Sequence, residues 1–515
     1  MMRISLLWLS IVALSWALTL DEAIEQTRTT NPVILERLKN FKSVVEDVGY
    51  AYGAFLPTVD IKVGFGREQV KNDTQSALKE LDVQSHSAVL KWNIFNGLGD
   101  FQVVAQQESR LKASAYSYVE SFDDTMLELI TTYIDILRHK ELMEVEIDNI
   151  KMDEKIYEDM INKQKEGAGR LSDLKEARSK LALAYTNHLS EENNVQNILI
   201  AMHKHLGRYV RLDEVVPTSF HEQLPNTLEE ITRLALENNP SIHVALHEFK
   251  AAQSEYHSTT KNFLPSIDLE LSATHTENLS GFERTYQALG GMIYANYNLF
   301  NGTRDTAYAQ KKISTMQQKH EELNSAKRTV MEKVQLAWSL FRITSKQSVF
   351  TDWYVKSSKD KLNSYYREFN INSQQRSLID LLGASDDYNN ARRKMINTKY
   401  DLMVARYKLL NAIGDLSIAL GVDARADVGL EEHRRDYKLQ KESNDVIRDA
   451  DLDGILNARD ICDNSEANSS NNHYGCSYHI PSNNTNFGAL ESFLIDEASH
   501  VIEKSLSQPQ LDDIE

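Results

Sequence analysis

The segment Asn298-Leu-Phe-Asn-Gly302 lies where an alternating, strand-like pattern of apolar residues ends and a long helical pattern begins. A nearly identical segment, Asn93-Ile-Phe-Asn-Gly97, occupies the same kind of boundary earlier in the chain. Two further motifs recur in the same order, Asn31-Pro32 with Asn239-Pro240 and Phe55-Leu56-Pro57 with Phe263-Leu264-Pro265. The sequence therefore indicates an internal duplication, which is the first constraint on the fold.

The composition favours long helices. Only 20 Gly and 8 Pro interrupt 515 residues, too few for many compact domains built from short elements. The net charge of −18 and the lack of a basic stripe argue against nucleic acid as a partner. The same charge suits a solvated surface or lumen that prefers cations.

The N-terminus has the pattern of a cleavable export signal, which we expect to span residues 1–17. Arg3 supplies a positive charge, Ile4 to Leu14 an apolar core, and Ser15-Trp16-Ala17 a small-x-small cleavage site. No Cys follows the core, so a lipid anchor is not indicated. The alternative is a membrane-anchoring or buried helix, which the short apolar run disfavours. No later window of about 18 apolar residues remains, so the rest could cross a membrane only as strands closed into a barrel.

Both halves of the chain predict the same order of elements. Two helical stretches precede a pair of strands, and a very long helix with a returning partner follows. The expected strands are 59–65, 88–94, 267–273 and 289–299, and the expected long helices and their returning partners are 101–165 with 171–205 and 304–368 with 377–420. We expect repeats at 18–216 and 217–422, a charged linker at 423–448 and an appended tail at 449–515.

Four strands cannot close a barrel, and open sheets with one face of Val, Ile, Leu, Phe and Trp would be insoluble. Three copies would supply 12 strands, an ordinary number for an outer-membrane barrel. The alternative is that the strands pack on the helices of the same chain. The two copies of the pattern, each in phase with a long helical hairpin, favour the barrel. The expected fold is therefore mainly α with β.

The order of these motifs resembles that of the TolC-type outer-membrane efflux proteins. Further matches are Leu20-Asp-Glu-Ala-Ile24, Ile231-Thr-Arg-Leu-Ala-Leu236 and Arg376-Ser-Leu-Ile-Asp-Leu-Leu382, and the resemblance covers about residues 18–422. It implies a homotrimer in the outer membrane of a Gram-negative bacterium, with a 12-stranded barrel continued by a periplasmic tunnel of 12 helices. Such proteins are passive ducts that require no cofactor for transport. A periplasmic adaptor (membrane fusion) protein joins them to an inner-membrane transporter, either ABC-type or proton-driven.

No catalytic motif opposes this interpretation, because the sequence contains no phosphate-binding loop, nucleophile elbow or His-Glu-x-x-His helix. The resemblance implies that Asp380 projects into the closed periplasmic entrance and that Arg376 takes part in contacts that hold it shut. Three symmetry-related carboxylates would raise one another's pKa or recruit a cation. Gly383 stands where the family often has a second acid, which predicts weaker block by multivalent cations. The alternative is that Asp380 is a solvated charge on a helix face.

In the first hairpin tip, Gly167 and Gly169 permit a tight reversal. The family uses the tips as the adaptor-docking surface, and the resemblance assigns that role to Gly167, Gly169 and Arg170.

The tail carries a separate signal for Ca²⁺. Oxygen ligands occupy alternate positions, a Gly at position six permits a sharp bend, and a carboxylate stands at position twelve. The candidate ligands are Asp449, Asp451, Asp453, Asn457 and Asp460. With Cys462 this segment resembles a single thrombospondin type 3 repeat, and Cys462 and Cys476 can form a disulfide in an exported protein. The alternative is a plain acidic linker.

The cargo remains open within the duct hypothesis. The tip motif and the calcium-like tail favour type I secretion of large, adhesin-like proteins, by resemblance only. The alternative cargo is small toxic compounds or drugs. A hypothesis from another class is a periplasmic helical scaffold in which the calcium module is the working part.

Overall fold

The computed structural model describes residues 17–71, 78–220, 224–225, 227–371 and 376–430. The expected signal peptide up to residue 16, the proposed calcium ligands and both cysteines lie outside these residues. The described residues belong to one compact unit, which extends to Leu430. Ala424, Val428 and Leu430 are buried in its core, so this unit continues past the repeat boundary expected at Val422.

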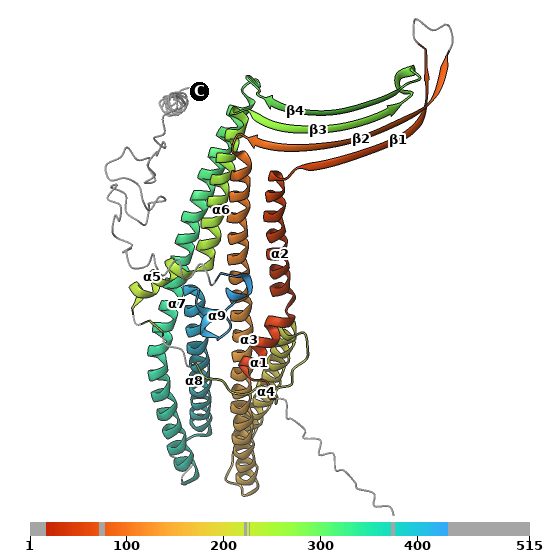
Figure 1. Cartoon of the computed structure of the whole chain (residues 1–515). Coiled ribbons are helices and arrows are strands. Elements are labelled where there is room, and N and C mark those ends of the chain that lie inside the picture. Colours follow the sequence, from red (N-terminus) through yellow and green to blue (C-terminus); the bar gives the residue numbers. More distant parts are fainter. Residues whose placement is uncertain (1–16, 72–77, 221–223, 226, 372–375, 431–515) are drawn as a thin grey trace, which may run out of the picture. The chain divides into compact units, whose positions relative to one another are not determined.

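The first repeat contains two short helices, two strands and a long helical hairpin (Figure 1). Its elements are α1 (Leu20–Thr30), α2 (Pro32–Tyr52), β1 (Thr58–Val70), β2 (Lys79–Asn96), α3 (Gly99–Lys165) and α4 (Leu171–Leu206). The 67 residues of α3 make a helix about 100 Å long. The strands are longer than expected, because Arg67 and Asp82, assigned to a polar connection, pair across them at 2.9 Å.

The second repeat has the same element order, which confirms the predicted fold class. Its elements are α5 (Leu228–Asn238), α6 (Pro240–His257), β3 (Ser266–Glu277), β4 (Thr285–Asn296), α7 (Arg304–Ile371) and α8 (Leu378–Ile413), followed by α9 (Leu416–Ala419). Strand β3 extends to Glu277, past the expected end at 273, and two other elements end earlier than expected. Strand β4 ends at Asn296 rather than 299, and α8 ends at Ile413 rather than 420, because Gly414 takes a left-handed conformation (φ 88°) that ends the helix.

The two Asn-Pro motifs join pairs of helices end to end. Asn31 caps α2 by accepting a hydrogen bond from the Val33 amide at 2.9 Å, while its side-chain amide donates to the His205 carbonyl at the end of α4. Asn239 caps α6 in the same way and donates to the Ala412 carbonyl near the end of α8 at 2.9 Å. Each proline occupies the first helical turn, where no amide is needed. Each asparagine side chain therefore forms hydrogen bonds with a backbone amide at the start of one helix and with a backbone carbonyl at the end of another.

The two Phe-Asn-Gly motifs turn the chain from a strand into a long helix. Gly97 and the next residue, Leu98, both have positive φ (54° and 60°), as do Gly302 and Thr303 (62° and 66°). A side chain at Gly97 would place its Cβ 2.7 Å from the Lys261 Cα, so glycine is required there. The Asn preceding each glycine donates to an Asp four residues later, in the pairs Asn96–Asp100 at 3.0 Å and Asn301–Asp305 at 3.4 Å.

The four strands form one antiparallel sheet in the order β1-β2-β3-β4 (Figure 1). The register places Ile61, Ala88, Ala273 and Leu289 in one row across the sheet. The next row, Lys62, Ser87, Thr274 and Ala288, lies on the opposite face. Apolar side chains on the face that carries Ile61 are exposed to solvent, since Ile61 is 73 % and Leu289 89 % exposed. No helix in the described part of the chain is long and apolar enough to span a membrane.

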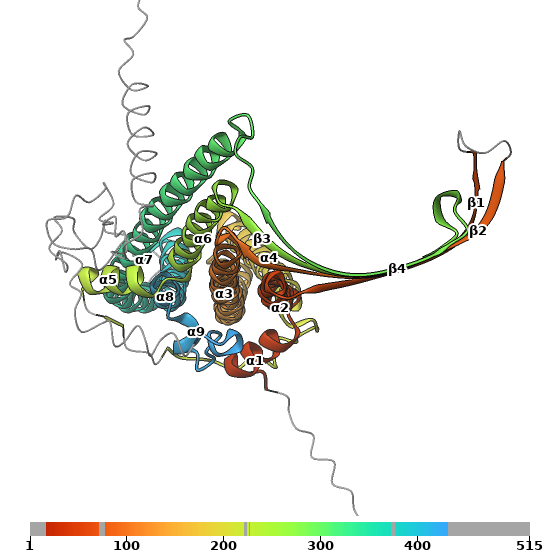
Figure 2. The same ribbon diagram turned by 45° about the horizontal axis from the view of Figure 1, so that its top comes forward.

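Helix α3 is the centre of the helical part. It packs against α2 and α6, and also against α4 and α8, while α7 packs against α6 and α8. Helices α1 and α9 also contact α3 and cover one side of it (Figure 2). Most of the largest buried side chains of this core come from α3, including Tyr118, Phe122, Met126, Ile130 and Tyr133.

Candidate functional site

The tip of the first hairpin, between α3 and α4, is a tight turn built on glycine. Gly167 has a left-handed conformation (φ 78°), and its amide donates to the Gln164 carbonyl at 3.0 Å. A Cβ at position 169 would lie 2.8 Å from the Gln164 nitrogen, so Gly169 is required by a close approach of backbone. Arg170 is the N-cap residue of α4 and makes no capping hydrogen bond with its side chain. The geometric prediction for both glycines is confirmed, while a docking role stays a prediction.

The tip of the second hairpin starts α8 with a capping box. Ser377 is the N-cap, and its hydroxyl accepts a hydrogen bond from the Asp380 amide at 3.2 Å. The Asp380 carboxylate accepts in return from the Ser377 amide at 3.2 Å and from its hydroxyl at 2.9 Å. These hydrogen bonds from Ser377 lower the pKa of Asp380, with Arg376 adding to the effect. In a single chain Asp380 is therefore an exposed residue in the first turn of α8, and its surroundings favour the ionised form.

Arg376 is held to its own hairpin. Its Nε donates to Glu368 at 2.7 Å, and its guanidinium stacks on the Tyr365 ring at 4.0 Å from the ring centre. Both partners belong to α7. Among the described residues no hydrogen bond or ion pair joins Arg376 to Asp380. Arg376 thus fixes the end of α7 near the start of α8.

The structure adds contacts that link the two hairpins near their tips, and the sequence interpretation missed them. The Tyr366 hydroxyl of α7 donates to Asp159 of α3 at 3.3 Å. The Lys163 ammonium of α3 lies 3.7 Å from the centre of the Phe369 ring of α7. An apolar cluster lies beside them and includes Ile156, Met160, Phe369, Leu378 and Leu381. We call these contacts the tip clamp, and any separation of the hairpins must break it.

Farther from the tips, a row of ion pairs joins α3 to α8. The pairs run antiparallel along the two helices, and their partners are Arg138–Asp401 (2.8 Å), Glu141–Lys399 (2.8 Å), Glu146–Arg393 (2.6 Å) and Asp148–Arg392 (3.0 Å). Glu146 has a side chain that is only 3 % exposed, and burial raises its pKa while Arg393 opposes that shift. A buried carboxylate that depends on one arginine is costly to separate from it. This row therefore resists separation of α8 from α3.

Both repeats of the chain are similar to proteins of a known family. The model of the outer membrane efflux protein family matches residues 23–208 and 231–415, once in each repeat. The outer membrane efflux protein BepC of Brucella suis is 20 % identical over 401 residues, covering 77 % of this chain and 85 % of BepC. The outer membrane protein TolC of Escherichia coli is 18 % identical over 423 residues, covering 79 % of this chain and 84 % of TolC.

The chain is also similar to a channel of known structure and to a protein named for protease secretion. The CmeC outer membrane channel of Campylobacter jejuni superposes with a TM-score of 0.68 over 77 % of this chain and 86 % of CmeC, at 16 % identity, which shows the shared fold. The proteases secretion protein PrtF of Dickeya chrysanthemi is 18 % identical over 259 residues, covering 49 % of this chain and 55 % of PrtF.

Proposed function

The chain belongs to the outer membrane efflux protein family, and from this premise we propose that three copies form one continuous exit duct across the outer membrane and the periplasm. Members of this family are outer-membrane channels of Gram-negative bacteria and act as passive conduits, so the chain is a channel protein and not an enzyme.

The sheet is the observation that carries the proposal. One of its faces is apolar and exposed, and the other carries charged and hydroxyl side chains such as Lys62 and Thr274. Strands β1 and β4 each have one edge without a partner among the described strands. Such edges are unstable in isolation. Joining β4 of one copy to β1 of the next, three times over, pairs every edge, turns the apolar faces to lipid and the polar faces to water.

The two long hairpins would then form the wall of a tunnel below the barrel. We propose that the second tips converge on the threefold axis, where three copies of Asp380 surround the entrance. The pKa of Asp380 is low in the single chain, so the ring would start as three negative charges. Their repulsion favours binding of a cation at the closed entrance. Arg376 supports the entrance indirectly, because its hydrogen bond to Glu368 holds the start of α8 to the end of α7.

Asp380→Asn tests the gate. We expect weaker cation selectivity and weaker block by multivalent cations in single-channel recordings, since the variant keeps an acceptor for the Ser377 amide but loses the charge. Asp173→Asn, in the first tip, is the control and should leave both properties unchanged. Equal behaviour of Asp380→Asn and the unaltered protein would remove the gate assignment.

The same tips, Gly167, Gly169 and Arg170 among them, are proposed as the docking surface for a periplasmic adaptor that leads to an inner-membrane transporter. Arg170 is the best residue to test, because its side chain makes no capping bond that folding requires. Arg170→Glu should reduce co-purification of the adaptor after cross-linking and leave the trimer intact. Export that continues at the normal rate would contradict this docking site.

For the cargo we propose type I secretion of large proteins, with small-molecule efflux as the second candidate. The name of the relative PrtF, a proteases secretion protein, supports the first candidate, and the names of BepC and TolC leave both open. Deletion of the chain, followed by comparison of secreted proteins and of drug tolerance, separates them. Loss of a large secreted protein with unchanged drug tolerance is expected, and the reverse result would favour efflux.

The calcium loop in the tail, with ligands Asp449, Asp451, Asp453, Asn457 and Asp460, remains a proposal of its own. Titration of the full chain with Ca²⁺ by calorimetry should give a saturable heat that Asp451→Asn weakens. The absence of any heat would remove it. The scaffold hypothesis is tested separately, because it requires a species that stays in solution without detergent.

A further inference from the structure

Helices α3 and α8 face each other in a constant antiparallel register. The contacts that fix this register nearest the tips are Glu146–Arg393, Asp148–Arg392 and Asn149–Asn389. About one helical turn closer to the tips, the same register places Asp153 of α3 opposite Asp386 of α8. Two acids therefore meet at the position where the row of ion pairs between the two helices would continue.

The two acids differ in burial and share one lysine. Asp153 is only 7 % exposed, whereas half of the Asp386 side chain is exposed. The Lys180 ammonium of α4 lies 2.7 Å from the Asp386 carboxylate. In the described part of the chain no ion pair or hydrogen bond joins Lys180 to Asp153. Lys180 is therefore bonded to the more exposed acid, and the buried acid has no direct cationic partner.

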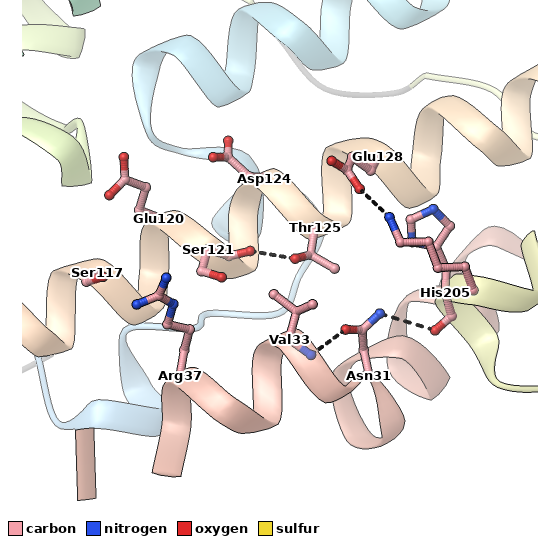
Figure 3. Close-up of a pocket in the computed structure, with 11 residues that line it drawn as sticks. Asn31, Val33, Arg37, Ser117, Glu120, Ser121, Asp124, Thr125, Glu128 and His205 are labelled. Atoms are coloured by element: carbon pink, nitrogen blue, oxygen red, sulfur yellow. Dashed lines mark hydrogen bonds and ion pairs between the residues drawn. The ribbon is translucent and has the colours of Figure 1, made fainter. Parts of the chain in front are cut away.

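A second contact between α3 and α4 shows the ordinary arrangement. Glu128 of α3 lies 3.7 Å from Lys204 of α4, and Figure 3 shows this ion pair beside the helix. Both side chains are exposed to solvent, so one negative charge meets one positive charge and their separation costs little. Around Lys180, two negative charges face one positive charge, and one of the two acids is buried.

This arrangement makes the contact between α3 and α8 depend on one proton. Burial raises the pKa of Asp153 to about 6, the charge of Asp386 adds to the shift, and the charge of Lys180 opposes it. Below that pH the neutral Asp153 side chain can donate a hydrogen bond toward the Asp386 carboxylate. Above it the two carboxylates repel each other, and separation of the helices lets water reach Asp153.

The three residues lie on the interface between the two hairpins. Asp153 and Lys180 belong to the first hairpin, formed by α3 and α4, and Asp386 belongs to the second, formed by α7 and α8. Along α3 they lie between the tip clamp and the row of ion pairs. Any movement of the second hairpin away from the first must therefore part Asp386 from both Asp153 and Lys180.

We propose that Asp153, Asp386 and Lys180 form a proton-sensitive joint between the two hairpins, in which a proton on Asp153 holds α3 to α8 and its loss loosens them. We call these residues the acid joint. It is complete within one chain, and only its effect on the entrance rests on the proposed function. In the duct, a fall in pH would favour the closed entrance and a rise in pH would favour opening.

Single-channel recordings at about pH 5 and about pH 7.5 test the effect on the duct. We expect the ratio of open to closed time to rise about tenfold, because opening lowers the pKa of Asp153 from about 6 toward about 3.9. Asp153→Asn stays neutral at both pH values and should remove most of this rise. Glu154→Gln is the control and should retain it, because Glu154 bonds to Tyr185 of α4 at the exposed surface.

Hydrogen exchange of the α8 amides tests the joint whether or not the preparation forms pores. At about pH 7.5, amides around Asp386 should exchange several times more slowly in Asp153→Asn than in the unaltered chain, whereas at about pH 5 the two should exchange alike. If Asp153→Asn fails to fold, Asp386→Asn replaces it. This variant changes an exposed residue and removes the like charge, so it should reduce the rise in open time.

Three results would overturn the acid joint. They are equal exchange of Asp153→Asn and the unaltered chain at both pH values, a rise in open time in Asp153→Asn as steep as in Glu154→Gln, and an undiminished rise in Asp386→Asn. The expected exchange pattern in a preparation that forms no pores would support the joint and contradict the duct alone.

Discussion

Helices α3 and α7 are nearly the same length and hold equivalent positions in the two repeats, yet their surroundings differ. Of the 67 residues of α3, 24 are buried, against 9 of the 68 residues of α7. Helix α7 instead exposes large apolar side chains, including Leu336, Ile343, Phe350 and Trp353. Monomeric soluble proteins rarely expose so many large apolar side chains along one helix. Helix α3 is therefore covered within one chain, whereas the apolar face of α7 fits a contact with a neighbouring copy.

Truncating one aromatic residue on each helix should give the largest difference between α3 and α7. Phe122 of α3 is fully buried, so Phe122→Ala should cost about 3–5 kcal/mol of folding stability and lower the yield of folded chain. Phe350 of α7 is 64 % exposed, so Phe350→Ala should change the folding of a single chain by less than about 0.5 kcal/mol and weaken the trimer instead. Thermal unfolding by circular dichroism and unheated gel electrophoresis measure the two effects. Equal loss of folding in both variants would contradict the difference between the helices.

The two helix-ending glycines offer a second, matched test. Gly207 and Gly414 both have left-handed backbone (φ 70° and 88°) at the ends of α4 and α8. A Cβ at Gly414 would lie 2.8 Å from both the Asn238 oxygen and the Asn239 Cα, whereas a Cβ at Gly207 would meet nothing within 4 Å. Gly414→Ala should therefore cost about 3 kcal/mol or more, and Gly207→Ala only about 1 kcal/mol. Identical melting temperatures for the two variants would show that the second junction is not tightly packed.

Asp123 provides a pH-dependent test of the core around α3. Burial raises its folded-state pKa to about 7, well above the value of about 3.9 for an exposed Asp. The folded protein therefore binds more protons than the unfolded chain between these values, and stability from this group is full below about pH 4 and is lost as the pH rises through 7. The loss should be about 2–4 kcal/mol, because hydrogen bonds from Ser417 and the charge of Arg425 oppose the rise in pKa while the charge of Asp124 adds to it. Asp123→Asn should flatten unfolding curves measured from pH 4 to pH 7, and an unchanged slope would show that Asp123 remains ionised.

The tip clamp should give the smallest effect. Tyr366→Phe removes one hydrogen bond to Asp159 and keeps the ring, so the closed arrangement should lose about 1 kcal/mol. Single-channel recordings should then show open events several times more often. Tyr354→Phe, on the exposed surface of the same helix, is the control. An unchanged open probability in Tyr366→Phe would mean that the apolar part of the clamp alone holds the hairpins together.

The sequence predicted the element order because hydrophobic periodicity is a local signal, and the duplicated Asn-Pro and Phe-Asn-Gly motifs mark the same junctions in both repeats. It placed the end of α8 too late because Leu416, Ile418 and Leu420 continue an apolar pattern beyond Gly414. It made β1 and β2 too short because their outer residues are polar and pair across the sheet. Local patterns do not specify which residues meet across distant helices.

The candidate site was therefore predicted only in part. Both tip glycines follow from the need for a tight turn, and the sequence contains the Ser377 and Asp380 capping pattern, although its role as a cap became visible only in the structure. The contact between Tyr366 and Asp159 and the row of ion pairs between α3 and α8 join segments far apart in the chain. Nothing in the spacing of these residues marks them as partners, since each also fits a solvated helix face.

The trimer is tested by the mass of the protein in outer-membrane fractions, compared on gels before and after heating. We expect an unheated species with three times the mass of one chain that separates into single chains on boiling, because barrel strands from three copies pair edge to edge. A species with the mass of one chain in both lanes, recovered without detergent, would contradict it.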